Sequence, residues 1–274
     1  MAINAIDIQA LKDAHRKTWA SGDYARIAEL VTDVGERVVE RAGVHAGSDV
    51  LDVAAGTGNA SIPAARAGAR VIATDLAPEL FAAGRKRASE AGLEIEWRAA
   101  DAEDLPFENE RFDYVLSSLG VQFAPRHEVV ARELVRVCRS GGTIALGNWA
   151  ADGYIGRFWT IMGPYLPPPP DYASPPANWG RSEHVERLFA EYPVEVTSER
   201  FALDFEADSA DAFIDTLADY YGPLLQARNK LTAIGRWDAL RDELIALSSE
   251  MNGAGDGHFR APSAYLITLA RKRK

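Results

Sequence analysis

Short apolar runs alternate with amphipathic stretches along the chain from residue 49 onward. Apolar runs bounded by turn residues predict buried strands, and apolar positions three and four apart predict helices. The pattern predicts seven strands, at 49–54, 70–75, 94–98, 112–117, 143–148, 194–205 and 264–270. Helices are expected at 59–67, 78–91, 128–137 and 183–191 and within 210–249. Because strands that alternate with helices of this length form βαβ units, we expect an α/β fold with a mostly parallel sheet.

Two segments lie outside this alternation. Residues 1–46 have the spacing of amphipathic helices, and half of the 14 prolines fall between Pro164 and Pro176. Consecutive prolines form a stiff extended connector rather than a helix or a strand. We therefore expect one domain of residues 1–274, with a helical cap (1–46), a core (47–150), a proline- and aromatic-rich inserted lid (151–192) and a C-terminal part that completes the sheet (193–274).

The composition is that of an ordinary globular protein, with 47% hydrophobic and 26% charged residues. These values exclude disordered, collagen-like and coiled-coil chains. No apolar stretch approaches the roughly 18 residues that a membrane-spanning helix needs, and the first residues lack a basic-then-apolar secretory signal. The single cysteine, Cys138, cannot form an internal disulfide, which fits the reducing cytoplasm.

The charge balance disfavours nucleic acid as a partner, because the net charge is −10 and a phosphate-binding surface needs an excess of Lys and Arg. The basic run Arg271–Lys274 is expected to be a solvated tail after the last strand. The oligomeric state is left open.

A glycine turn follows the first predicted strand and precedes a helix, with Gly56 and Gly58 soon after Asp52. Glycine lets the backbone turn sharply and approach a ligand closely. Asp75 ends the second strand and Asp101 follows the third. Because the carboxyl ends of parallel strands meet at one crevice, these groups suit a nucleoside ligand whose ribose hydroxyls donate to a carboxylate. Any one of these acids also suits a helix cap.

The same turn departs from the dinucleotide motif, whose third glycine is replaced by Ser61. Acids outnumber bases around the turn, which favours a cationic ligand over a polyanionic one. An NAD-dependent oxidoreductase remains an alternative, because such enzymes share the glycine turn and an acid equivalent to Asp75.

This combination of motifs resembles the class I S-adenosylmethionine (SAM)-dependent methyltransferases of the ubiquinone/menaquinone-biosynthesis-like, or type 11, group. The resemblance implies a Rossmann-like, doubly wound seven-stranded sheet, SAM as cofactor and S-adenosylhomocysteine as product. The chain departs from the family at Ala54, where a glycine is usual and where alanine is expected to have little effect. The matching stretches are Val50–Asn59, Ala73–Pro78, Asp101–Phe107, Phe112–Ser117 and Glu133–Gly142.

The resemblance implies a role for each strand end. The backbone of the glycine loop passes beneath the methionine part of SAM, with Asp52 near its ammonium group. Asp75 holds the ribose hydroxyls, and Asp101 accepts from the adenine amino group. The implied cofactor-binding residues are Asp52, Ala54, Gly56, Thr57, Gly58, Asn59, Asp75, Leu76, Asp101, Ala102, Glu103, Ser118 and Leu119.

Methyl transfer is an in-line displacement that needs alignment of the reacting atoms, and a general base only when the acceptor is protonated. His127 is the candidate base and His184 a weaker one, although either histidine also suits a plain structural position. The histidines and the cysteine lack metal-ligand spacing, so we expect no metal.

The acceptor pocket is expected outside the core, where aromatic residues gather. Ordinary core packing is the alternative for these residues. The predicted activity is methyl transfer to a small aromatic or lipophilic acceptor at oxygen, nitrogen or carbon, and a non-catalytic SAM-binding protein is a further alternative. The candidate pocket residues are Trp19, Tyr24, Gln122, Phe123, Trp149, Trp159 and Trp179.

Overall fold

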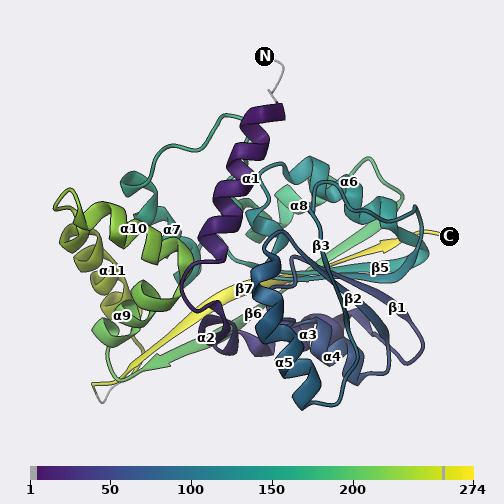
Figure 1. Cartoon of the computed structure of the whole chain (residues 1–274), viewed down its shortest axis with the longest axis horizontal. Coiled ribbons are helices and arrows are strands. Elements are labelled where there is room, and N and C mark those ends of the chain that lie inside the picture. The colour runs from purple at the N-terminus through teal and green to yellow at the C-terminus, as the bar shows by residue number, and fades with distance from the viewer. Residues whose placement is uncertain (1–4, 255–256) are drawn as a thin grey trace.

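Seven strands lie side by side in one sheet in the computed structural model, which describes residues 5–254 and 257–274 (Figure 1). Their order across the sheet is β3-β2-β1-β4-β5-β7-β6. Strands β1 to β5 pair in parallel, whereas β7 runs antiparallel to both of its neighbours. The expected α/β fold with a mostly parallel sheet is confirmed. The strands are β1 (Asp49–Val53), β2 (Arg70–Asp75), β3 (Glu96–Ala99), β4 (Phe112–Ser118), β5 (Cys138–Trp149), β6 (Val194–Ala207) and β7 (Phe259–Lys272).

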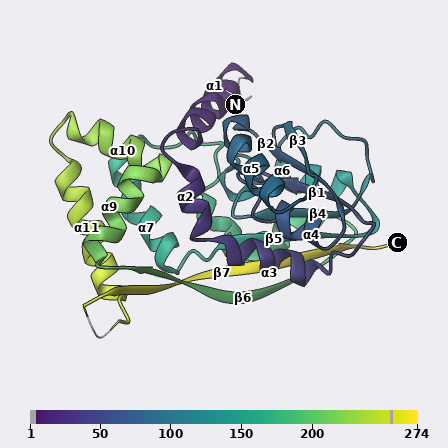
Figure 2. The ribbon, with the colours of Figure 1, turned by 60° about the horizontal axis from the view of Figure 1, so that its bottom comes forward.

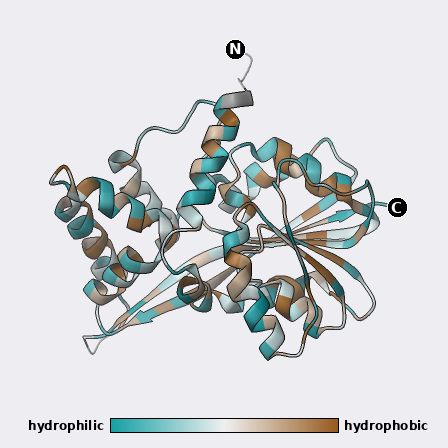
Figure 3. Cartoon of the chain, viewed as in Figure 1, coloured by the Kyte–Doolittle hydropathy of each residue, from teal (hydrophilic) through white to brown (hydrophobic). Residues whose placement is uncertain are grey.

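Helices cover both faces of the sheet. Successive side chains of a parallel strand point to opposite faces, so a strand of consecutive apolar residues needs cover on both sides. Val50 of β1 belongs to the apolar cluster of α3 (Thr32–Ala42) and α4 (Ser61–Arg66). The next residue, Leu51, belongs to the cluster of α6 (His127–Val137) and α8 (Ser182–Phe189). Apolar residues accordingly line the centre of the sheet, while polar residues cover the outer sides of the helices (Figure 3). Helix α5 (Phe81–Glu90) packs over β2 and β3.

A second group of helices gathers at one end of the molecule, over the long strands β6 and β7 (Figure 2). Helix α1 (Ala5–Trp19) contacts α10, and α2 (Tyr24–Glu29) contacts α9, so the first two helices stand between this group and the core. Short 3-10 turns complete the chain at Pro78–Leu80, Val121–Phe123, Gly163–Tyr165 and Pro176–Gly180. The group comprises α7 (Tyr154–Met162), α9 (Ala210–Tyr220), α10 (Gly222–Thr232) and α11 (Trp237–Met251).

The basic C-terminal run differs from its prediction, since β7 continues through Lys272. Arg271 pairs in register with Thr143 and Glu195. The Lys272 ammonium donates to the carbonyls of Val135 (3.1 Å) and Cys138 (2.9 Å). The prediction of a solvated tail is therefore wrong for Lys272, whereas Arg271 is exposed although it belongs to the strand. The Lys272 ammonium satisfies carbonyl groups at the C-terminal end of α6. The charge pattern of the tail alone does not show that these carbonyl groups lie beside it.

Candidate active site

The glycine turn after β1 forms a tight backbone loop. Gly56 and Gly58 take positive φ values of 56° and 86°, and a Cβ on Gly58 would lie 2.8 Å from the ring of Trp97. Ala54 also takes a positive φ, 55°. A left-handed conformation costs an L-residue about 1–2 kcal/mol, so the alanine is strained where the family usually has glycine. Strain of this kind gathers at functional sites.

Two buried carboxylates meet beneath this loop. Asp75 accepts from the backbone N–H groups of Gly56 and Ala77, each at 2.8 Å. Asp52 accepts from the Ser61 hydroxyl at 2.5 Å through Oδ2, while its Oδ1 is buried with no partner among the described residues. Burial raises the pKa of Asp52 to about 7 and that of Asp75 to about 6. An orphaned carboxylate oxygen in an acidic site is suited to a cationic ligand.

The third acidic strand end is joined to the first helix. The Lys12 ammonium of α1 lies 2.5 Å from Asp101 Oδ2 and 2.6 Å from Glu103 Oε2, and Lys12 is 5% exposed. Glu103 also accepts from the Arg126 side chain at 2.7 Å, and its side chain is fully buried. Helix α1 is therefore held across the strand ends by an ion-pair cluster.

These strand ends enclose a cavity of about 890 Å³ up to its open mouth, which we term the strand-end pocket. Lys12, His15 and Trp19 of α1 form one wall, facing the glycine loop. The predicted residues that line it are Trp19, Tyr24, Ala54, Gly56, Thr57, Asn59, Asp75, Leu76, Asp101, Ala102, Ser118, Leu119 and Phe123.

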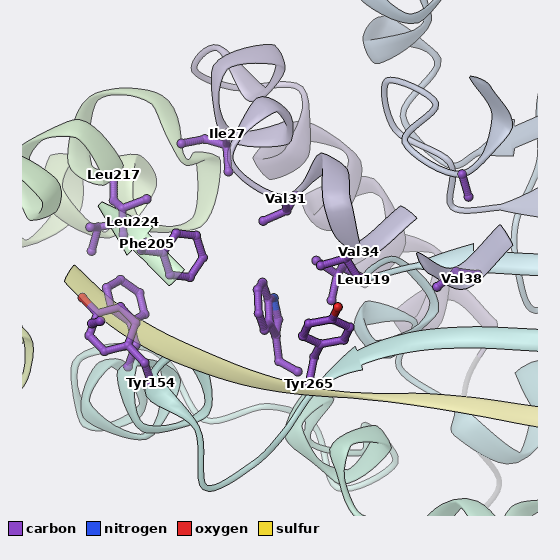
Figure 4. Packing of buried hydrophobic residues seen from close by; sticks show 14 of the residues in the cluster. Ile27, Val31, Val34, Val38, Leu119, Tyr154, Phe205, Leu217, Leu224 and Tyr265 are labelled. Carbon is purple, nitrogen blue, oxygen red and sulfur yellow. The ribbon is translucent and has the colours of Figure 1, made fainter. Parts of the chain in front are cut away.

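A second cavity, of about 520 Å³, shares Trp19, Tyr24, Val31, Leu119 and Phe123 with the first, and we term it the apolar chamber. Figure 4 shows Ile27, Val31, Phe205 and Leu217 around this interior. No charged residue is among the described residues that line it. Its walls are Trp19, Tyr24, Ile27, Leu30, Val31, Leu119, Phe123, Trp149, Ile155, Phe158, Trp159, Phe205, Leu217 and Tyr221.

Several predicted site residues lie outside both cavities. Asp52, Gly58 and Glu103 support the strand-end pocket from behind, through the contacts given above. Gln122 is fully buried, where it accepts from the Trp149 backbone N–H (3.2 Å) and donates to the Leu119 carbonyl (3.0 Å). Trp179 is fully buried against Phe189 in the cluster of α6 and α8. The structure therefore places Gln122 and Trp179 in the protein interior, away from the predicted acceptor pocket.

The two candidate bases contact each other and line neither cavity. His127 Nδ1 lies 3.1 Å from His184 Nε2, and the His127 ring packs against Trp179 at 5.4 Å. Burial lowers the pKa of His127 to about 4 and also lowers the pKa of His184. The geometry supports the structural interpretation of this pair.

The part of the predicted lid that reaches a cavity is α7, whereas the proline-rich residues do not reach one. From the inserted segment 151–192, Ile155, Phe158 and Trp159 reach the apolar chamber, and all three belong to α7. The proline-rich residues 164–176 line neither cavity, and Ser174 there donates to the Pro125 carbonyl at 2.8 Å. The walls that the sequence did not predict come from α1, α2, α7, β6 and α9 and from Tyr221. The i, i+3, i+7 spacing of Lys12, His15 and Trp19 was the available signal for α1.

Residues 51–146 match a family model described as "Methyltransferase domain". This match contains the glycine loop, Asp75 and Asp101, the parts that build the strand-end pocket. The chain belongs to the type 11 family of class I SAM-dependent methyltransferases. It catalyses methyl transfer from SAM, and the alternatives of an NAD-dependent oxidoreductase and a non-catalytic protein are set aside.

Relatives of this methyltransferase span most of its length. An uncharacterized protein of Mycobacterium tuberculosis is 45% identical over 267 residues, covering 96% of each chain. The malonyl-[acyl-carrier protein] O-methyltransferase of Serratia marcescens is 34% identical over 160 residues, 58% of this chain and 60% of its own. The YcgJ protein of Bacillus subtilis shares the fold, with a TM-score of 0.63 at 17% identity over 88% of this chain and 99% of its own.

The methyltransferase site fits SAM in its charge and its shape. Asp75 and Asp101 give the pocket an acidic lining, and the glycine loop leaves backbone space that a Cβ on Gly56 would fill next to Tyr24, at 3.2 Å. The part of the chain that the structure describes contains no cluster of ligands for a metal ion. In the same residues, no helix is both long and apolar enough to cross a bilayer.

Proposed function

We propose that this methyltransferase acts on a small aromatic or lipophilic acceptor bound in the apolar chamber. The observation that carries the proposal is the chamber itself, which adjoins the strand-end pocket and is lined by apolar and aromatic side chains. Such walls bind flat or apolar molecules by removing their surface from water. We further propose that the chain works as one domain in the cytoplasm, supported by the continuous sheet and the single buried Cys138.

The strand-end pocket is proposed to hold SAM through the residues that line it. Asp75 accepts from the ribose hydroxyls, and Asp101 from the adenine amino group. The Asp52 charge acts on the ammonium group from behind the glycine loop, outside the lining of the pocket. Ser118 and Leu119 border the methyl group at the boundary with the chamber. The proposed support is their placement at one crevice and the acidic character of the site, which suits a cationic ligand.

The bound SAM supplies an electrophilic methyl carbon, which leaves neutral S-adenosylhomocysteine after transfer. The chain's own contribution is to align the acceptor atom with that carbon and to exclude water. Trp19 and Tyr24 stand at the junction of the two cavities and set this alignment. No carboxylate or imidazole is among the described residues of the chamber, so the proposal gives none of these residues the role of general base.

The chamber also distinguishes this acceptor from that of the Serratia relative. A malonyl group carries a carboxylate, which a buried site holds only with a cationic or hydrogen-bonding partner. The described residues of the chamber offer no Lys, Arg or His to balance that charge, and the hydrogen-bonding side chains among them are neutral tyrosines and tryptophans. The proposal therefore favours an acceptor without a carboxylate at the reacting end.

Calorimetric titration with S-adenosylhomocysteine tests the proposed cofactor residues. Asp75→Ala removes a carboxylate that receives charge-assisted hydrogen bonds, so we expect the affinity to fall by roughly 1.5–3 kcal/mol, about 10- to 150-fold. Asp219→Ala on the surface of α9 is the matched control and should bind like the wild type. An unchanged affinity for Asp75→Ala removes this residue from the ribose role.

Transfer of tritium from methyl-labelled SAM tests the acceptor class. We expect label in products of apolar aromatic compounds and none in malonyl thioesters, because the chamber has no cationic group for the second class. Preferential labelling of the malonyl thioester would contradict the proposal.

A further inference from the structure

The apolar chamber contains two phenol hydroxyls. Tyr24 and Tyr221 line it, and the other polar side-chain atoms among its described walls are indole N–H groups. Trp19 joins the two tyrosines, with its ring in edge contact with Tyr24 at 5.6 Å and with Tyr221 at 5.8 Å. Phe123 packs against Trp19 from another side at 4.6 Å. The two tyrosines thus belong to one aromatic cluster at the wall of the chamber.

The two hydroxyls differ in what they already bind. The Tyr221 oxygen accepts from the Trp159 indole, which leaves its own O–H available. Neither hydroxyl donates a hydrogen bond to another residue within the described parts of the chain. Tyrosine hydroxyls in protein interiors normally find a partner, so two free donors on one cavity wall point to a ligand with a matching acceptor atom.

The position of Tyr24 connects this pair to the reaction. Its ring lies where a Cβ on Gly56 would come within 3.2 Å, and it lines both cavities. Tyr221 also lines the apolar chamber and packs on the same Trp19 ring, close enough for Tyr24 to raise its pKa. A group held by both hydroxyls is therefore at the boundary between the cofactor and the acceptor cavities.

We propose that Tyr24 and Tyr221 form the recognition site for a hydroxyl group on an uncharged aromatic acceptor. The inference rests on the proposed function and adds the chemical class of the acceptor and two specificity residues. A hydroxyl group matches the pair because it accepts from one phenol and donates to another. An uncharged ring matches the walls, because a charge in this chamber has no counter-ion.

The electrostatics of the site keep both phenols neutral. Burial and the nearby Asp75 carboxylate raise the pKa of Tyr24 to about 12. Burial also raises the pKa of Tyr221, with Tyr24 adding to the effect. Both tyrosines therefore remain hydrogen-bond donors throughout the physiological pH range, which suits recognition rather than proton removal.

Three naphthalene probes test this assignment on the full chain saturated with S-adenosylhomocysteine. They are 2-naphthol, naphthalene and 2-naphthoate, which share a ring system and differ in the polar group. We expect wild-type protein to bind 2-naphthol about fivefold more tightly than naphthalene, as one or two net hydrogen bonds predict, and to bind 2-naphthoate most weakly. Fluorescence titration gives each dissociation constant.

The variants Tyr24→Phe and Tyr221→Phe separate recognition from packing. Each keeps the ring and loses the hydroxyl, so naphthalene affinity should stay within twofold while the preference for 2-naphthol disappears. Tyr220→Phe, next to Tyr221 and outside the chamber walls, is the matched control and should keep the preference. Thermal melts confirm that each variant is folded.

Three outcomes overturn the assignment: tightest binding of 2-naphthoate, a 2-naphthol preference that persists in both Phe variants, or binding of none of the probes. A 2-naphthol preference that persists in both Phe variants overturns only the assignment of the two tyrosines and leaves the proposed function standing. Tightest binding of 2-naphthoate, or binding of none of the probes while S-adenosylhomocysteine still binds, also rejects the proposed apolar acceptor.

Discussion

At the scale of single residues, the site keeps carboxylates in surroundings that disfavour their charge. Asp52 and Asp75 are both buried, and the pKa of each is raised, to about 7 and about 6. Desolvation is the main cause, and the Asp75 charge further raises the pKa of Asp52. A cationic ligand reverses this cost because it favours the ionised form. The buried carboxylates therefore lower the stability of the ligand-free protein and raise its affinity for a cationic ligand.

Asp52→Asn tests this trade of stability for binding. A carboxyl whose folded pKa exceeds its unfolded value of about 3.9 contributes stability at low pH that is lost as the pH rises toward 7. We therefore expect the stability of the apo variant relative to the wild type to increase by roughly 2–3 kcal/mol between pH 5 and pH 8. Urea unfolding at both pH values gives the two free energies.

The same variant should bind S-adenosylhomocysteine more weakly at pH 8, since it lacks the charge that acts on the ligand's ammonium group. Ser61→Ala, which removes the donor to Asp52 Oδ2 and leaves the charge, is the control for local packing. A variant that is equally stable at both pH values relative to the wild type contradicts the account of Asp52.

At the scale of elements, the sequence predicts best where the pattern is local. Strands β1, β2 and β4 lie within one residue of their predicted bounds, because buried runs such as 112–117 end at clear turn residues. Strand β5 begins five residues before its prediction, at Cys138, since Gly141 and Gly142 indicated a turn. The strand is irregular at these glycines, because Cys138 pairs with Phe112, the register then shifts, and regular pairing resumes at Thr143 with Tyr114, while Gly141 has a φ of 77°.

The sequence did not predict that α1 packs against the ends of the strands. Its Lys12 binds Asp101 and Glu103, which lie about 90 residues away along the chain. The spacing of residues within α1 predicts its apolar face, but it contains no information on which carboxylates the helix contacts. Long-range ion pairs of this kind need the three-dimensional arrangement of the strand ends.

Lys12→Ala should loosen α1 from the strand ends. Removing one partner of a buried ion pair costs about 3–5 kcal/mol. Here Glu103 keeps Arg126 and Asp101 gains water when α1 moves, so we expect a smaller loss of about 2 kcal/mol. Faster chymotryptic cleavage within α1 and a lower melting temperature are the readouts.

Lys17→Ala, an exposed lysine of the same helix, is the matched control for the loss of one charge from α1. Equal cleavage rates for the two variants would show that the Lys12 cluster does not hold the helix.

At the scale of the whole molecule, the fold brings two cavities to one edge of the sheet. The strand-end pocket comes mainly from residues of the core, in a segment where motif spacing predicted most of its walls. The apolar chamber combines α1, α2, α7, β6 and α9 with Tyr221. Its walls are separated by as many as 200 residues, from Trp19 to Tyr221. Aromatic composition suggested such a chamber, but Phe205, Leu217 and Tyr221 had no local signal that distinguished them from ordinary core residues.

The long strands β6 and β7 make this arrangement possible (Figure 1). They pair over 14 residues and carry α9, α10 and α11 beyond the core. The helices then meet α1 and α2, which closes the chamber next to the strand-end pocket. The two cavities that we propose for the cofactor and the acceptor therefore adjoin each other and share the walls formed by Trp19, Tyr24 and Leu119.

The position of bound S-adenosylhomocysteine in a crystal of the full chain tests the central claim most directly. The account predicts electron density for the adenosyl group beside Asp75 and Asp101, with the sulfur at the boundary formed by Tyr24 and Leu119 and directed toward the apolar chamber. Density elsewhere on the molecule, or a sulfur that points away from the chamber, would contradict it.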